Sequence, residues 1–130
     1  MIALEVSVSS PESRRAQDLD PRFRNALRAA IARGLDAVAT DARANVLALR
    51  DPTRLGPSLL AESIRTEVDR DGAGGVVRAG GDIAPYAVFV EFGTTHAPAQ
   101  PFLGPALAMN AGRIRADIGS AMTNALGDGP

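Results

Sequence analysis

The chain has 130 residues, of which 45% are hydrophobic, with 14 basic and 15 acidic side chains and a formal net charge of −1. This length indicates one domain over residues 1–130, and the near-neutral charge argues against a strongly basic nucleic-acid-binding module. Cysteine is absent, which excludes disulfide bonds, thiolate metal ligands and a cysteine nucleophile. No apolar run approaches the roughly 18 residues of a membrane span, so we expect no membrane partner.

The N-terminal segment, residues 1–10, has the pattern of a strand. Apolar side chains at Ile2, Leu4, Val6 and Val8 alternate with Ala3, Glu5 and Ser7. A period of two, with β-branched residues on one side, predicts a half-buried strand.

A long amphipathic helix is predicted over residues 20–50. Asp20-Pro21 is a typical start, because aspartate caps a helix and proline suits its first position. One apolar stripe follows at three- and four-residue steps: Phe23, Leu27, Ile31, Leu35, Val38, Ala42, Val46 and Leu49. The helix should end at Asp51-Pro52, because a residue before proline avoids the α region. Gly34 is its expected weak point, at about 1 kcal/mol relative to alanine.

Residues 58–92 predict a short helix followed by a hairpin. Ser58 can cap a helical turn that carries Leu59, Leu60 and Ile64. Alternation over 64–69, a glycine-rich turn at 71–75 and apolar residues at 76–79 then predict two paired strands. For 86–92 two interpretations stay open. Pro85 can start a helix in which Tyr86, Phe89 and Val90 share a face, whereas the β-forming residues favour a strand.

Residues 93–100 are predicted to form a projecting loop stiffened by prolines, and residues 101–126 a second long helix. The apolar stripe of that helix consists of Leu103, Leu107, Asn110, Ile114, Ile118, Met122 and Leu126. The predicted fold is therefore α+β, with a long N-terminal helix and a C-terminal helix packed on a small, mainly antiparallel sheet.

The sequence gives little support to catalysis or to metal or cofactor binding, and we expect none of them. His96 is the only histidine, so a two-histidine metal site is impossible. The glycine runs lack phosphate-binding motifs, and the chain has no lysine. Asp82 and Glu91 could form a glycosidase-like pair, but no motif supports it. An unpaired Glu91 would be costly to bury, so we expect it to bond the backbone of residues 93–95 or an arginine.

The most distinctive segment is YAVFVEFGTTHAPAQPFLGPAL, residues 86–107. It contains Tyr-Ala, Val-Glu-Phe-Gly-Thr and Pro-Ala-Gln-Pro-Phe-Leu-Gly-Pro-Ala-Leu. This pattern is similar to the signature of the small head–tail joining, neck or tail-completion proteins of long-tailed lambdoid-like phages, related prophages and gene transfer agents. Upstream, residues 55–64 match loosely that family's Thr-Gly-x-Leu-x-x-Ser-Ile element, without its threonine. The resemblance covers about residues 20–125.

The resemblance implies a structural virion protein and not an enzyme. Copies would form a homo-oligomeric ring, with a hexamer favoured and a dodecamer possible, at the virion neck or tail after assembly in the host cytoplasm. Its neighbours would be head connector and tail proteins, and DNA would pass through its lumen without sequence-specific binding. The alternatives are a tail terminator or head-completion stopper ring and, disfavoured, a small hydrolytic enzyme that uses Glu91, Asp82 or His96.

We assign the assembly contacts to the loop and the residues that follow it, with Phe102 and Leu103 as anchors. The full set is Gly93, Thr94, Thr95, His96, Pro98, Gln100, Pro101, Phe102 and Leu103. The motif core comprises Tyr86, Phe89, Glu91 and Phe92. Tyr86 and Phe89 are predicted to belong to the domain's own core, so that Phe89→Ala would cost about 3 kcal/mol or more.

Overall fold

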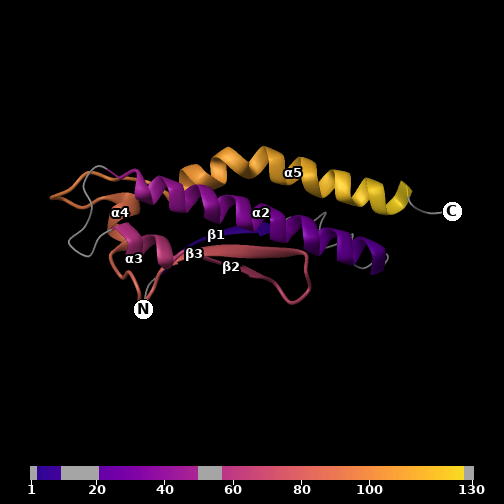
Figure 1. Ribbon diagram of the computed structural model, residues 1–130, viewed down its shortest axis with the longest axis horizontal. Helices are drawn as coiled ribbons and strands as arrows, with labels where there is room; N and C mark the ends of the chain where they lie inside the picture. Colours follow the sequence, from indigo (N-terminus) through magenta and orange to yellow (C-terminus); the bar gives the residue numbers. More distant parts are fainter. Residues whose placement is uncertain (1–2, 10–20, 50–56, 128–130) are drawn as a thin grey trace.

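The computed structural model describes residues 3–9, 21–49 and 57–127. Its elements are β1 (Ala3–Ser9), α2 (Pro21–Leu47), α3 (Pro57–Glu62), β2 (Arg65–Val68), β3 (Gly74–Gly80), α4 (Ala87–Phe92) and α5 (Leu103–Gly127). The two long helices run antiparallel, with α5 along α2 and α2 along the sheet, while α3 and α4 lie at one end (Figure 1). The predicted α+β fold is confirmed.

The sheet has three antiparallel strands in the order β1-β3-β2. The expected alternation of β1 is present, because Leu4, Val6 and Val8 pack against the core while Glu5, Ser7 and Ser9 are exposed. Near the start of β3, a Cβ atom added at Gly75 would come within 2.6 Å of the Leu35 side chain. This glycine therefore lets α2 lie close to the sheet.

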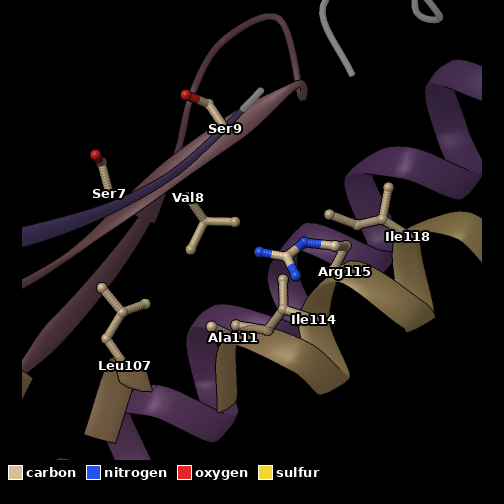
Figure 2. Close-up of a pocket in the computed structure, with 8 residues that line it drawn as sticks. All are labelled: Ser7, Val8, Ser9, Leu107, Ala111, Ile114, Arg115 and Ile118. Carbon is tan, nitrogen blue, oxygen red and sulfur yellow. The ribbon is translucent and has the colours of Figure 1, made fainter. Parts of the chain in front are cut away.

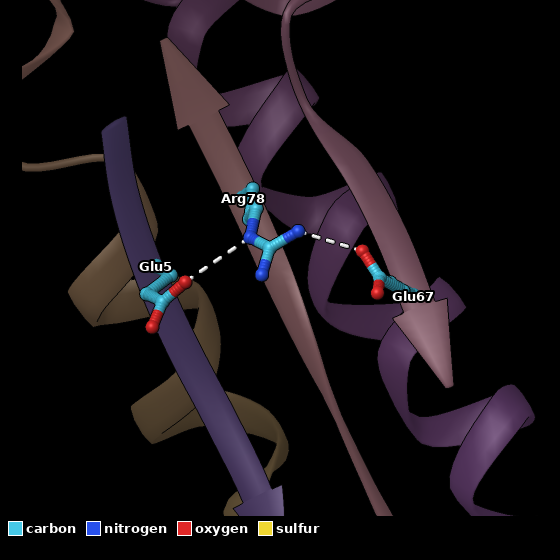
Figure 3. Close-up of polar contacts among 3 residues, drawn as sticks. All are labelled: Glu5, Glu67 and Arg78. Carbon is cyan, nitrogen blue, oxygen red and sulfur yellow. Dashed lines mark hydrogen bonds and ion pairs between the residues drawn. The ribbon is translucent and has the colours of Figure 1, made fainter. Parts of the chain in front are cut away.

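The other face of the sheet carries a polar cluster. Arg78 of β3 donates hydrogen bonds to Glu5 of β1 at 3.1 Å and to Glu67 of β2 at 2.6 Å (Figure 3). The hydrogen bond with Glu5, and then the charge of Glu67, raise the pKa of Arg78 above its usual value. The three side chains are well exposed, so the cluster links the strands in register and adds little stability.

The core lies between α2, α5 and the inner sheet face. The predicted stripe of α2 is buried from Phe23 to Val46, and Leu49 is partly buried. The helix ends at Leu47, a few residues before the expected stop, and Asp20, Asp51 and Pro52 lie outside the described residues. Its amphipathic pattern therefore positions α2 as the element on which the others pack.

Gly34 has a different role from the expected one. It is buried, and a Cβ atom at this position would lie 2.9 Å from Cγ1 of Ile114 on α5. The glycine therefore permits close packing of α2 and α5, which offsets its low helix propensity. Beside it, Arg33 bonds Asp117 at 3.1 Å, and the Asn110 amide donates to Asp41 at 2.7 Å.

The predicted short helix and hairpin are present as α3, β2 and β3, and β3 is longer than the expected 76–79. The proposed cap at Ser58 lies outside the described side chains. Buried Ser63 connects the two parts: its hydroxyl donates to the Leu60 carbonyl at 2.6 Å and accepts from the Gly80 N–H at 2.9 Å. At the turn, Arg28 of α2 donates to the Arg70 carbonyl at 2.8 Å, which fixes the hairpin on the helical layer.

Candidate functional site

In the segment 86–92, for which helix and strand were both possible, Ala87–Phe92 form the short helix α4 and Tyr86 is its N-cap residue. Its inward face consists of Ala87 and Glu91, which are buried. Phe89 and Phe92 point outward, with 60% and 70% of their surface exposed. The prediction that Phe89 belongs to the core is therefore wrong. Tyr86 does pack against the core, as expected, from the turn that precedes the helix.

Glu91 is the structural centre of the segment. Its Oε1 accepts hydrogen bonds from the backbone N–H groups of Phe102 at 3.1 Å and Leu103 at 2.9 Å, and its Oε2 accepts one from Gly104 at 3.2 Å. We expected bonds to backbone N–H groups. The partners, however, lie at the start of α5 and not in the 93–95 turn.

These contacts satisfy the backbone N–H groups at the start of α5. A helix leaves its first four N–H groups without intrahelical partners. In α5 three of them bond Glu91, and the fourth residue, Pro105, has no N–H to satisfy. A carboxylate at this end is also favoured by the helix dipole. Glu91 therefore acts as a remote N-cap and connects α4 rigidly to α5.

The loop between the two helices is closed at its base. The Gln100 N–H donates to the Val90 carbonyl at 2.8 Å. Thr94 organises the tip, since its hydroxyl accepts from the N–H groups of His96 and Ala97 at 3.1 Å each. Gly93 has a φ of 77°, and a Cβ atom there would lie 2.6 Å from the Ala99 nitrogen. Only glycine fits this position without strain.

The predicted contact residues divide into two groups. Thr94, Thr95, His96, Pro98 and Pro101 are exposed, and Gly93 and Gln100 are partly exposed, so these seven are available for contacts. Phe102 and Leu103, the predicted anchors, are 0% and 2% exposed. That part of the prediction is wrong, because both side chains fill the core beneath α2. Asn45 of α2 fixes this point by donating to the Phe102 carbonyl at 3.0 Å.

The three ionisable residues considered for catalysis, Asp82, Glu91 and His96, do not meet in an active-site arrangement. Asp82 and His96 are exposed in separate loops, while both oxygens of Glu91 are occupied by backbone donors. Among the described residues, no group of three or more histidine, aspartate or glutamate side chains could hold a metal ion. None of the helices formed by the described residues is long and apolar enough to cross a membrane.

A groove that the sequence did not indicate lies between β1 and α5 (Figure 2). It has a volume of about 290 Å³ and is lined by Val8 of β1 and by Leu107, Ala111, Ile114, Arg115 and Ile118 of α5. Figure 2 shows Val8 pointing from the strand toward the α5 side chains. Leu107 and Ile118 lie on the apolar stripe of α5 but are only partly buried, and the stripe itself does not show which of its residues the core leaves uncovered.

The exposed aromatics of α4 and the β1/α5 groove are thus two apolar surfaces of the described residues. Comparisons with protein-family models, with curated proteins and with solved structures found no match to the chain.

Proposed function

We propose that this protein is a structural component of a tailed phage or of a phage-like particle such as a gene transfer agent. Copies of it form a ring at the head–tail joint, next to head connector and tail proteins. The ring is a hexamer in the favoured arrangement and surrounds the passing DNA without reading its sequence. The resemblance of residues 86–107 to neck and tail-completion proteins supplies this function class.

The observation that carries the proposal is the braced unit formed by α4, the loop and α5. Three bonds to Glu91 and the bond between Gln100 and Val90 hold α4, the loop and the start of α5 together. It presents two largely exposed phenylalanines beside a proline-stiffened loop. Exposed aromatic side chains on a rigid support are typical of protein–protein contacts, because little entropy is lost when they dock. The motif residues thus have a physical reason to occur together.

The proposal is tested in the particles of the element that encodes the chain. Purified particles should contain the protein at a constant copy number by quantitative mass spectrometry, and cryo-electron microscopy should place it at the neck. Deletion of the gene should leave heads and tails unjoined. Absence of the protein from purified particles, or normal joined particles after deletion, would refute the proposal. A ring seen at the tail end or on the head connector alone would favour the terminator or stopper alternative.

A matched pair of variants tests the surface itself in the deletion background. Phe92→Ser should fail to restore joined particles, because it removes an exposed aromatic of α4. Met109→Ser removes a comparable apolar side chain from α5, where Met109 is 74% exposed, and should restore them. Equal complementation by the two variants would show that α4 is not an assembly surface.

A further inference from the structure

We infer that β2 of one copy pairs edge to edge with β1 of the next copy, so that the sheets of neighbouring copies join around the ring. The inference deepens the proposed function and rests on it for its biological setting. Its physical basis is that the sheet, in the order β1-β3-β2, ends in two different strands. Figure 3 shows β3 between β1 and β2, which are the two outer strands. Each outer strand can pair with one further strand on its open side.

The backbones of both outer strands direct hydrogen-bonding groups toward these open edges. In an antiparallel pair, the N–H and C=O of one residue point to the same side. The Gly74 carbonyl accepts from Asp69, and the Gly80 N–H donates to Ser63, which flank β2 in the chain. The even-numbered residues of β3 therefore face β2, and its odd-numbered residues face β1. By the strand register, the residues with outward-pointing backbone groups are Thr66 and Val68 of β2 and Ala3, Glu5, Ser7 and Ser9 of β1.

β1 lacks the features by which proteins usually prevent an edge strand from pairing. Those features are a very short strand, prolines, bulges and inward-pointing charges. β1 has seven residues without a proline, and its register with β3 is unbroken from Ala3 to Ser9. Its one charged residue, Glu5, lies on the outer face of the sheet (Figure 3). Val6 and Val8 on the inner face are only partly buried, so a strand added beside them would bury more apolar surface.

The charges at the two edges are complementary. At the β1 edge, the Glu5 side chain is 55% exposed and bonds Arg78 through one of its two oxygens. At the β2 edge, Arg65 is exposed, and its side chain forms no ion pair with another described residue, although a Cβ atom at Gly81 would lie 3.8 Å from its Nη2. Two β1 strands paired with each other would instead bring two glutamates together, which repel. The charges therefore favour β2 of a second copy as the partner of β1.

The geometry of a ring places these two charges side by side. Arg65 and Glu5 both pair with Arg78 across the sheet, so they lie at the same height within one copy. β1 and β2 both run antiparallel to β3 and are therefore parallel to each other. A rotation about an axis along the strands keeps height and direction, so β2 meets the next β1 in parallel, with Arg65 beside Glu5. Neighbouring strands lie about 4.8 Å apart, which lets the two side chains form an ion pair. Two positions further along, Glu67 lies beside Ser7.

The test traps this contact with a disulfide, because β2 has only four residues and the chain has no cysteine of its own. One preparation carries Ser7→Cys and a second carries Glu67→Cys, and both positions are exposed. Within one copy, β3 separates the two positions by two strand spacings, about 9.6 Å, which exceeds the roughly 7 Å limit for a disulfide. A bond between positions 7 and 67 therefore joins two copies.

The two variants are mixed at millimolar concentration and mildly oxidised, after circular dichroism has shown that both are folded. The double variant Ser7→Cys/Glu67→Cys is oxidised in assembled particles. Mass spectrometry should identify the bond between positions 7 and 67 in both preparations. The control replaces Glu67→Cys with Glu62→Cys, an exposed glutamate on α3, and should give only the background of random collisions.

A charge reversal tests the ion pair between copies. Arg65→Glu, added to the Glu67→Cys variant, should lower the disulfide yield about tenfold, which corresponds to about 1.4 kcal/mol, because two carboxylates then lie side by side. Arg70→Glu makes the same charge change at an exposed position of the hairpin turn and should leave the yield unchanged. Equal effects of the two reversals would overturn the pairing of Arg65 with Glu5.

The disulfide pattern decides between the inference and its competitors. Bonds between two copies of Ser7→Cys in excess of the mixed bond would show that β1 pairs with itself and would overturn the inference. A yield no higher than the control in both preparations would also overturn it, as would particles that contain the double variant without the bond. Failure of the proposed function is distinguishable, because the chain would then be absent from particles although the concentrated protein still formed the mixed bond.

Discussion

Replacing Glu91 with alanine should be among the most destabilising single changes outside the apolar core. The variant leaves the N–H groups of Phe102 and Leu103 without acceptors in a buried environment, at about 1–3 kcal/mol each. The N–H of Gly104 can bond water, because Gly104 is exposed. Loss of the negative charge at the start of α5 adds up to about 1 kcal/mol. We expect a total loss of about 3–5 kcal/mol.

The measurement is urea unfolding followed by circular dichroism, with the free energy taken from the midpoint and slope. Glu91→Gln should lose only about 1–2 kcal/mol, because one amide oxygen remains while its NH₂ group faces the Gly104 N–H. The control is Glu62→Gln, an exposed glutamate on α3, which should change stability by less than about 0.5 kcal/mol. A loss below about 1 kcal/mol for Glu91→Ala would refute the remote cap as a stabilising contact.

Three further expectations follow from the packing and are measured in the same unfolding assay. Gly34→Ala should destabilise by about 1 kcal/mol, since the strain against Ile114 exceeds the gain in helix propensity; a stabilised variant would contradict the close packing. Gly112→Ala, with nothing within 4 Å of the new Cβ atom, should instead stabilise by about 0.5–1 kcal/mol, and a loss would contradict it. Phe102→Ala should lower the free energy of unfolding by about 3–5 kcal/mol, because Phe102 is buried, whereas Phe89→Ala should lower it by less than about 0.5 kcal/mol. A larger loss for Phe89→Ala than for Phe102→Ala would contradict the burial of Phe102 and the exposure of Phe89.

The long elements could be predicted from the sequence because their burial follows from local period. In α2, every third or fourth residue from Phe23 to Val46 is apolar and buried, and β1 alternates as its side chains do. In both elements, many consecutive residues indicate the same buried face. The role of Gly34 could not be predicted in this way, because it depends on Ile114, which lies on another helix 80 positions away.

The short segment around α4 was less predictable for a related reason. A six-residue helix has too few positions for its apolar period to identify the inward face. Phe89 and Val90 suggested one face, whereas the bonds of Glu91 to α5 turn Ala87 and Glu91 inward. The sequence did contain a signal for the inward position of Glu91, because the start of α5 has no serine, threonine, aspartate or asparagine to cap it. The missing local cap implies a remote acceptor, and Glu91 is the nearest acidic residue before it.

The pairing of distant segments has a consequence for how the chain reaches its structure. Glu5 and Arg78 are 73 positions apart, and Arg33 and Asp117 are 84 positions apart. Contacts at such separations slow folding, because long loops must close before they form. α2 leaves the ribosome long before α5, so its apolar stripe has no helix to cover it during synthesis of the intervening residues. In that interval the nascent chain is most exposed to aggregation and most dependent on chaperones.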